Sequence, residues 1–215
     1  NQRAGLTLSW QKDALNAQVG VSANPTDTYN KTNGKTYKDN VVNWAPVARL
    51  RYRISDHTHI MVNYNGRSAQ PSTSQLMPVP DNTDPLNISL GNPYLKPYFS
   101  HDMRANFGYT NMKTFTSIHA NISGNMVQNA ITSAQWYDMT GVQYQIPVNG
   151  PASGSMNGRL MVNSPLGKSG LSIMSMTNAR YSRSTSYVGT IAFNTDLYYD
   201  PYDASFKYDA FKNDF

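Results

Sequence analysis

Hydrophobic and polar residues alternate along much of the chain, as they do in a β-strand that has one apolar face. The first alternating segment covers residues 6–11 and the second covers residues 15–23, with a short polar break at 12–14 between them. Two such segments joined by a short break predict a β-hairpin. A polar stretch rich in turn residues follows, from Asn24 to Asn40, and we interpret it as a long loop.

The same order of strand, short break, strand and long loop recurs along the chain. Further alternating segments lie at residues 48–54, 60–64, 103–109, 116–126, 142–146, 156–162 and 171–181. Together they predict about eight antiparallel strands and no helix, which is an all-β fold.

The faces opposite the apolar ones contain Asn, Ser, Thr, Gln, Gly and a few Arg instead of the Lys and Glu that usually meet water. Short breaks that alternate with long loops are typical of outer-membrane barrels, which have short periplasmic turns and longer extracellular loops. Aromatic residues near the expected strand ends suit the girdles at the two membrane interfaces. They are Trp10, Trp44, Tyr64, Tyr109, Trp136 and Tyr181. The pattern favours a transmembrane antiparallel β-barrel, and a soluble all-β domain with exposed tyrosines is the alternative.

The composition narrows these possibilities. Only 14% of the residues are charged, but 15 Tyr, 7 Phe and 3 Trp argue against a disordered chain. The absence of cysteine excludes disulfides, thiolate zinc sites and a cysteine nucleophile. A net charge of +5 with so few charges is a mild bias, and we expect no nucleic-acid partner.

Residues 70–111 carry an ordered set of motifs, QPSTSQLMPVPDNTDPLNISLGNPYLKPYFSHDMRANFGYTN. This segment resembles the barrel region of TonB-dependent receptor-like outer-membrane proteins, in particular the Bacteroidetes outer-membrane β-barrel family. Its most distinctive run consists of Gly91, Asn92, Pro93, Leu95, Lys96 and Pro97. The family usually has an acid after this run, where the chain has Tyr98. Because proline cannot donate to a sheet ladder, we expect an ordered non-strand excursion with a structural role.

The resemblance implies a larger protein. TonB-dependent transporters have barrels of about 22 strands with a plugged lumen, and about 10 residues per strand would use roughly 220 residues before any loop. We therefore expect residues 1–215 to form a partial barrel domain without a plug or TonB-binding segment. A small closed barrel of eight strands with a structural or envelope role remains an alternative, as does a soluble carbohydrate-binding module.

The resemblance also implies a function and partners. The whole protein would sit in the outer membrane of a Gram-negative bacterium, bind a nutrient at its outer face and admit it when TonB pulls on the plug. Its partners would be membrane lipid, TonB and the plug domain. The resemblance also allows a surface lipoprotein that forms a lid over the barrel.

Four arginines are the candidate binding residues. Arg49, Arg51 and Arg53 share one face of an expected strand, opposite the apolar face, and Arg104 extends the same lining. If the apolar face meets lipid, these arginines point into the lumen. They would then attract an anionic solute or pair with acids of a plug; an ordinary hydrated wall is the alternative.

Few other residues suggest a metal-binding, catalytic or ligand-binding role. His57 and His59 lack a third ligand at suitable spacing, so we predict no metal site. No catalytic or cofactor-binding motif is present, and we expect neither an enzyme nor a cofactor. Tyr-rich segments, including Tyr198, Tyr199 and Tyr202, would stack on a sugar or peptide or pack within loops.

Overall fold

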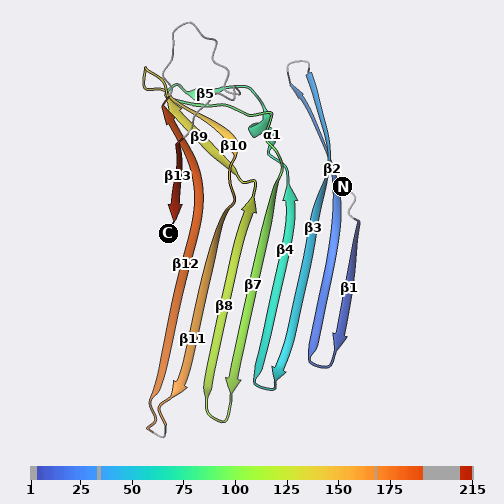
Figure 1. The fold of residues 1–215 in the computed structure, drawn as a ribbon, viewed down its shortest axis with the longest axis vertical. Helices are drawn as coiled ribbons and strands as arrows, with labels where there is room; N and C mark the ends of the chain where they lie inside the picture. Colours follow the sequence, from blue (N-terminus) through green and yellow to red (C-terminus); the bar gives the residue numbers. More distant parts are fainter. Residues whose placement is uncertain (1–3, 33–34, 168, 191–208, 215) are drawn as a thin grey trace.

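The computed structural model describes residues 4–32, 35–167, 169–190 and 209–214, and nearly all of them belong to one 13-stranded sheet (Figure 1). Eight long strands lie side by side in a single layer, and we call them the wall strands. They are β1 (Ala4–Lys12), β2 (Leu15–Thr32), β3 (Lys35–Ser55), β4 (Thr58–Ala69), β7 (Tyr98–Asn111), β8 (Thr116–Gln128), β11 (Ser153–Pro165) and β12 (Ser172–Thr190). The remaining elements are α1 (Thr73–Leu76), β5 (Asp81–Asp84), β6 (Asn87–Ser89), β9 (Ile131–Tyr137), β10 (Gln143–Asn149) and β13 (Asp209–Asp214).

The wall strands are antiparallel to their neighbours and follow one another in the order β1-β2-β3-β4-β7-β8-β11-β12. Short turns join them in pairs at one end, which is the lower end of Figure 1. The wall thus contains eight of the nine alternating segments, all except residues 142–146. None of the described helices is long and apolar enough to cross a membrane.

The expected loop from Asn24 to Asn40 is wrong. β2 continues to Thr32 and β3 already begins at Lys35, and the two strands stay paired from Asn24 opposite Asn43 to Thr32 opposite Lys35. A ladder of main-chain hydrogen bonds does not require alternating side chains. Thr and Tyr recur in this segment and favour extended backbone. The hairpin therefore extends beyond the part of the wall that the hydrophobic pattern marks.

The second difference concerns the two longest connections, residues 70–97 and 129–152, which we call the crown. The crown lies at the end of the wall opposite the short turns (Figure 1). β9 and β10 form a hairpin within it, so the segment 142–146 is not a strand of the wall. β10 pairs in parallel with β6, and β9 pairs in parallel with the end of β12. The crown is thus attached to the wall by contacts between segments far apart in sequence.

The excursion expected from the prolines is ordered, as predicted, but it is not free of secondary structure. Residues 70–97 include α1 and the strands β5 and β6, while every proline of this segment lies outside the strands. Ser72 begins the helix with a capping box, because its hydroxyl accepts from the Gln75 amide and the Gln75 side chain accepts from the Ser72 amide.

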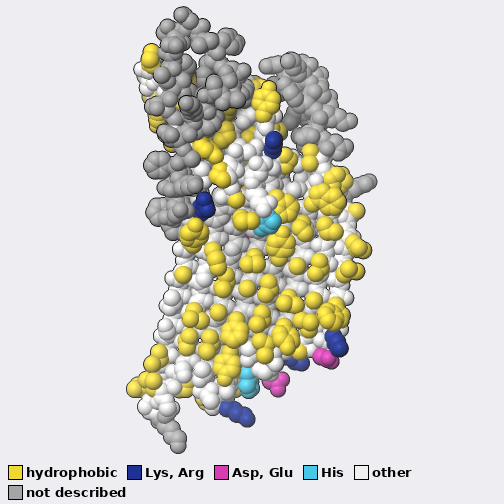
Figure 2. Space-filling model, viewed as in Figure 1, with side chains coloured by type: hydrophobic (Ala, Val, Ile, Leu, Met, Phe, Trp, Pro, Cys, Tyr) yellow, Lys and Arg dark blue, Asp and Glu magenta, His cyan; other side chains and the backbone are white. Residues whose placement is uncertain are grey.

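One face of the wall is apolar, and the described residues leave it uncovered. Cross-strand partners point to the same face, so the register aligns Leu50, Val62, Ala105 and Ile122 in one row. Leu8 is 70% exposed and Leu160 is 44% exposed. Figure 2 shows this face, with hydrophobic side chains across the whole wall and most charged ones gathered at the rim of short turns. So large an exposed apolar surface indicates contact with lipid.

The buried core lies elsewhere. Among the described residues, the buried hydrophobic side chains are Leu95, Ala130, Ala134, Trp136 and Ile146, all in the crown. Trp136, which we expected in an interfacial girdle, is only 1% exposed. Trp10, Trp44 and Tyr181 do project from the apolar face, each more than half exposed. The wall itself is a single layer without a core, unlike a soluble β-sandwich.

Candidate functional site

The four candidate arginines lie together on the polar face of the wall. Arg49 on β3 pairs with Asn63 on β4, which in turn pairs with Arg104 on β7. Arg51 and Arg53 follow on the same face of β3 at every second residue. All four side chains are exposed, and no ion pair holds them within the described part of the chain. The structure thus brings the predicted set together on one surface.

The register adds three arginines that the sequence analysis missed. Arg104 continues the row through Ser123 and Asn157 to Arg180, so that one polar row crosses six wall strands from Arg49 to Arg180. Arg159 lies in the row of Arg51, and Arg67 lies opposite Ser100. The alternation of Arg159 with Leu160, and of Arg180 with Tyr181, already placed both on polar faces. Their alignment with β3 required the register.

Acidic residues are scarce on this face. Where the structure describes the side chains of the wall strands, Asp102 is the only acid that shares the polar face with the seven arginines. The amide of Asn125 donates to Asp102 Oδ1 over 2.9 Å and to Ser100 Oγ over 3.1 Å. The polar face therefore carries an excess of positive charge, which would attract an anionic group.

The GNPYLKP run has contacts that explain its residue types. A Cβ added at Gly91 would lie 1.8 Å from the main-chain oxygen of Met77, so no larger residue fits there without moving the backbone. Asn92 donates from Nδ2 to the Pro147 oxygen over 2.9 Å and accepts the Tyr94 amide at Oδ1 over 2.9 Å. Leu95 is buried. The bond from Asn92 to Pro147 attaches residues 70–97 to β10.

Two asparagines complete the attachment at the start of β7. Asn149 accepts the Lys96 amide at Oδ1 over 2.7 Å and donates from Nδ2 to the Lys96 oxygen over 3.0 Å. Asn129 Nδ2 donates to the Pro97 oxygen over 2.7 Å. The run from Gly91 to Pro97 thus joins the two connections of the crown, and its contacts are structural.

Carboxylates in crown turns are held in the ionised form. The Thr140 hydroxyl, followed by main-chain amides, donates to Asp138 and holds the pKa of that carboxyl below its usual value. Thr83 lowers the pKa of Asp81 in the same way, first through its hydroxyl and then through its amide. Such bonds favour the charged form because a carboxylate is a stronger acceptor than a carboxylic acid.

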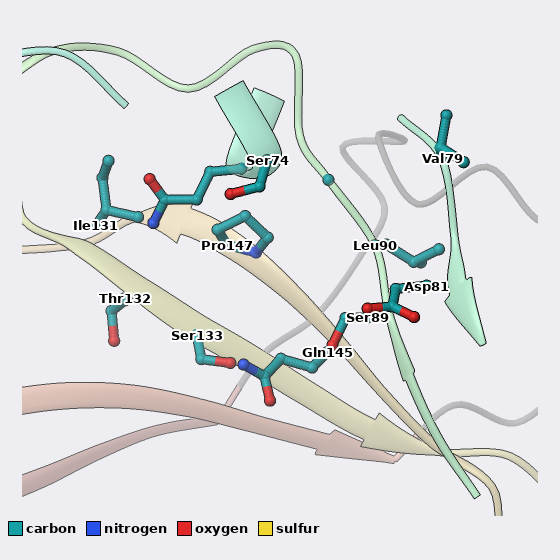
Figure 3. Close-up of a pocket in the computed structure, with 12 residues that line it drawn as sticks. Ser74, Val79, Asp81, Ser89, Leu90, Ile131, Thr132, Ser133, Gln145 and Pro147 are labelled. Carbon is teal, nitrogen blue, oxygen red and sulfur yellow. The ribbon is translucent and has the colours of Figure 1, made fainter. Parts of the chain in front are cut away.

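A pocket of about 420 Å³ lies where the two connections of the crown meet (Figure 3). Its walls come from the region of α1, from β6 and from the β9–β10 hairpin. Tyr198, Tyr199 and Tyr202, expected to stack on a ligand or pack in loops, lie outside the described residues.

The fold and its surfaces agree with what the chain resembles. A family model described as the outer membrane protein beta-barrel family matches residues 4–214. The chain belongs to this family. It lies in the outer membrane of a Gram-negative bacterium, and the apolar face of its wall contacts lipid.

Two solved structures are similar to the chain. The siderophore receptor PirA from Acinetobacter baumannii has a TM-score of 0.50 at 12% identity, over 85% of this chain and 26% of that one. The outer membrane transporter YddB from Escherichia coli has a TM-score of 0.43 at 11% identity, over 99% of this chain and 30% of that one. The chain therefore spans less than a third of the length of either protein. No curated protein matches the sequence.

Membership of this family also indicates which end of the wall is extracellular. It bears as well on the two alternative folds considered above, a soluble module and a small closed barrel. Outer-membrane barrels have short periplasmic turns and longer extracellular loops, so the crown is assigned to the extracellular side. A soluble carbohydrate-binding module does not fit a lipid-facing wall. A closed barrel of eight strands is not formed either, since β1 and β12 are not paired with each other in the described sheet.

Proposed function

We propose that the chain is part of the barrel of a TonB-dependent outer-membrane transporter or receptor of the Bacteroidetes type, which takes up a nutrient. The observation that carries this proposal is the open sheet. A lipid-facing sheet cannot leave the hydrogen-bonding groups of its edge strands unpaired within the membrane. β1 has a partner on one side only, β2, among the described residues.

Further strands must therefore complete the barrel. A barrel of about 22 strands would enclose a lumen wide enough for a plug. In this arrangement the wall strands provide the lipid contact, the polar face lines the lumen, and the crown lies at the extracellular opening. The partners would be TonB and a plug domain, with a surface lipoprotein as a possible lid, and no catalytic step is assigned to the chain.

The arginines give the lumen a charge preference. Among the wall side chains that the structure describes, seven arginines and one aspartate on the polar face favour a solute that carries negative charge. Arg49 and Arg104 lie in the same cross-strand row, two strands apart. At the usual separation of strands, their backbones are about 10 Å apart. A small multivalent anion would therefore interact with more than one guanidinium at a time.

The first experiment is the intact mass of the native polypeptide, extracted from outer membranes in detergent, with peptide sequencing of all of it. A mass several times 24.0 kDa, with an N-terminal plug and further alternating strands, is expected. A mass near 24.0 kDa would contradict the transporter proposal.

The charge preference is tested on the full-length protein with citrate as the anionic probe, by calorimetry at low salt. Replacing Arg49 and Arg104 together by Gln should weaken citrate binding by about tenfold, since both cations are lost. The matched variant with Arg49→Lys and Arg104→Lys keeps the charge and should bind nearly as well as wild type. Unchanged citrate binding, together with a lower unfolding temperature of the plug, would instead assign the arginines to plug contact.

A further inference from the structure

The pocket in the crown has walls of mixed chemistry. β9 and β10 pair so that Ser133 lies opposite Pro147, which places Ser133, Gln145 and Pro147 on the same face of the hairpin. The other face of the hairpin carries Trp136 and Ile146, which are buried. The hairpin therefore turns its apolar face into the crown core. Ser133, Gln145 and Pro147 on its other face line the pocket (Figure 3).

The pocket contains polar groups that the fold leaves available. Ser133 Oγ is buried and has no hydrogen-bond partner among the described residues. A buried hydroxyl without a partner is uncommon in folded proteins, because its loss of water is then not compensated. The hydroxyl of Ser89 lines the same space, as does the side-chain amide of Gln145, whose oxygen accepts from Gln135 Nε2 over 3.4 Å. These groups can both donate and accept hydrogen bonds.

The charge of the pocket excludes one class of ligand. Among the described residues that line it there is neither Lys nor Arg, and the one ionisable side chain is Asp81. Hydrogen bonds from Thr83, with its hydroxyl 2.6 Å from Asp81 Oδ1, lower the pKa of this carboxyl, so it is negative at neutral pH. An anion would be repelled here, in contrast to the arginine-rich face of the wall. Val79, Leu90 and Ile131 add apolar surface on which the carbon skeleton of a ligand can pack.

The pocket is fixed in shape by main-chain bonds. The Leu90 amide donates to the Gln145 oxygen over 2.8 Å, and the Asn92 amide donates to the Gln75 oxygen over 2.6 Å. Gly91 allows its backbone to approach Met77 closely between these two bonds. Walls fixed before binding reduce the loss of conformational freedom when a ligand binds.

We propose that this pocket binds a neutral, hydroxyl-rich ligand, a saccharide of one or two rings, on the extracellular side of the barrel. Its volume of about 420 Å³ lies within the usual range of ligand pockets, about 300–1,000 Å³. Hydroxyl groups match the combination of hydroxyl, amide and carboxylate groups on its walls. The site is separate from the arginine surface and opposite to it in charge preference, so it stands even if the transport proposal fails.

The test measures maltose and glucose binding to the full-length protein by saturation-transfer difference NMR. An amine-oxide detergent is used, because the headgroup of a maltoside detergent would compete for the pocket. Glucuronate serves as the acidic analogue of glucose. We expect saturable binding of at least one neutral sugar and weaker binding of glucuronate, because Asp81 repels its carboxylate.

The variants are Ser133→Ala and Gln145→Met, alone and combined. The double variant should weaken sugar binding by about tenfold, since two neutral hydrogen bonds are lost. The matched control is Ser123→Ala on the polar face of β8, which should bind as wild type does. The single variants are measured as well, so that a folding defect of the double variant does not decide the outcome.

Three results would overturn the proposal. They are no saturable binding of maltose or glucose, tighter binding of glucuronate than of glucose, and equal sugar affinity in the folded pocket variants and wild type.

Discussion

The wall and the crown are built from the same chain but are stabilised by different surroundings. The wall is a single layer whose apolar side chains remain exposed within the chain, and Leu8 is 70% exposed. The crown has a small core of its own, where Trp136 is 1% exposed and stacks on Tyr144 at a centroid distance of 5.6 Å. Lipid therefore takes the place of a protein core in the wall, while the crown relies on burial of its own side chains.

The two regions also differ in their polar contacts. The crown is fastened by asparagine side chains that bond to main-chain groups across 53 to 55 positions of sequence. Wall strands are held by main-chain ladders to the wall strands beside them. Damage to the crown should consequently leave the wall intact, and damage to the lipid face should leave the crown intact.

The largest effect is expected from Trp136→Ala. Removing a fully buried Trp side chain should destabilise the crown by about 3–5 kcal/mol, through lost burial and a cavity. Amide hydrogen exchange should become faster in β9 and β10 and stay unchanged in β3 and β4. Trp10→Ala is the matched control, since Trp10 is 59% exposed on the lipid face and leaves no protein cavity. Equal acceleration in both regions would show that they unfold as one unit.

A charge on the lipid face should have the next largest effect. Leu8→Arg places a cation in the middle of β1 on the apolar face and should cost about 2–4 kcal/mol if that position lies near the bilayer centre. The neighbouring variant Ser9→Arg puts the same charge on the polar face and should change stability little. Guanidinium unfolding in phospholipid vesicles measures both. Similar losses in the two variants would contradict the assignment of the faces.

Glycine substitutions should distinguish the two regions more finely. Gly91→Ala should destabilise the crown by about 1–3 kcal/mol, because the new Cβ overlaps the Met77 backbone. Gly158→Ala on β11 is the control, since a Cβ there meets nothing within 4 Å. Thermal unfolding followed by hydrogen exchange compares the two. A tolerated alanine at position 91 would mean that the crown is not held at this contact.

The smallest effect concerns pH. Because the pKa of Asp138 is lowered in the folded state, its hydrogen bonds stabilise the β9–β10 turn above pH 3.8 and are lost as the pH falls through the lower folded value. The protection of amides in this hairpin, measured relative to their intrinsic exchange rates at each pH, should fall at such acidic pH. Asp138→Asn should remove that part of the pH dependence, whereas Asp56→Asn in a wall turn should leave it unchanged. A hairpin equally sensitive to acid in Asp138→Asn would assign the effect to another group.

Several features could be predicted because they depend on neighbouring residues. The two-residue period identified the wall strands, and it placed Arg49, Arg51 and Arg53 on one face. The ordered excursion followed from its prolines, which cannot donate to a sheet. Period alone did not reveal the strands between Asn24 and Asn40, because their ladder persists where the alternation of side chains stops.

The burial of Trp136 could not be predicted from the sequence, for a different reason. A tryptophan near the end of an alternating segment has the same local pattern whether it faces a membrane interface or a protein core. Its burial depends on Leu90 and Tyr187, which pack on the same core from distant parts of the chain. The pairing of β6 with β10 is parallel and joins residues 56 positions apart in the sequence, so no local pattern specifies it.

By itself, the sequence determined most of the β-strand wall, its apolar and polar faces and the positions of its short turns, because these follow from the two-residue geometry of a strand. The tertiary structure alone decided how the two connections join into a crown, which arginines align across strands, and where a pocket opens. These features depend on strand register and on contacts between distant segments, and in both cases the position of one residue is set by residues far from it in the chain.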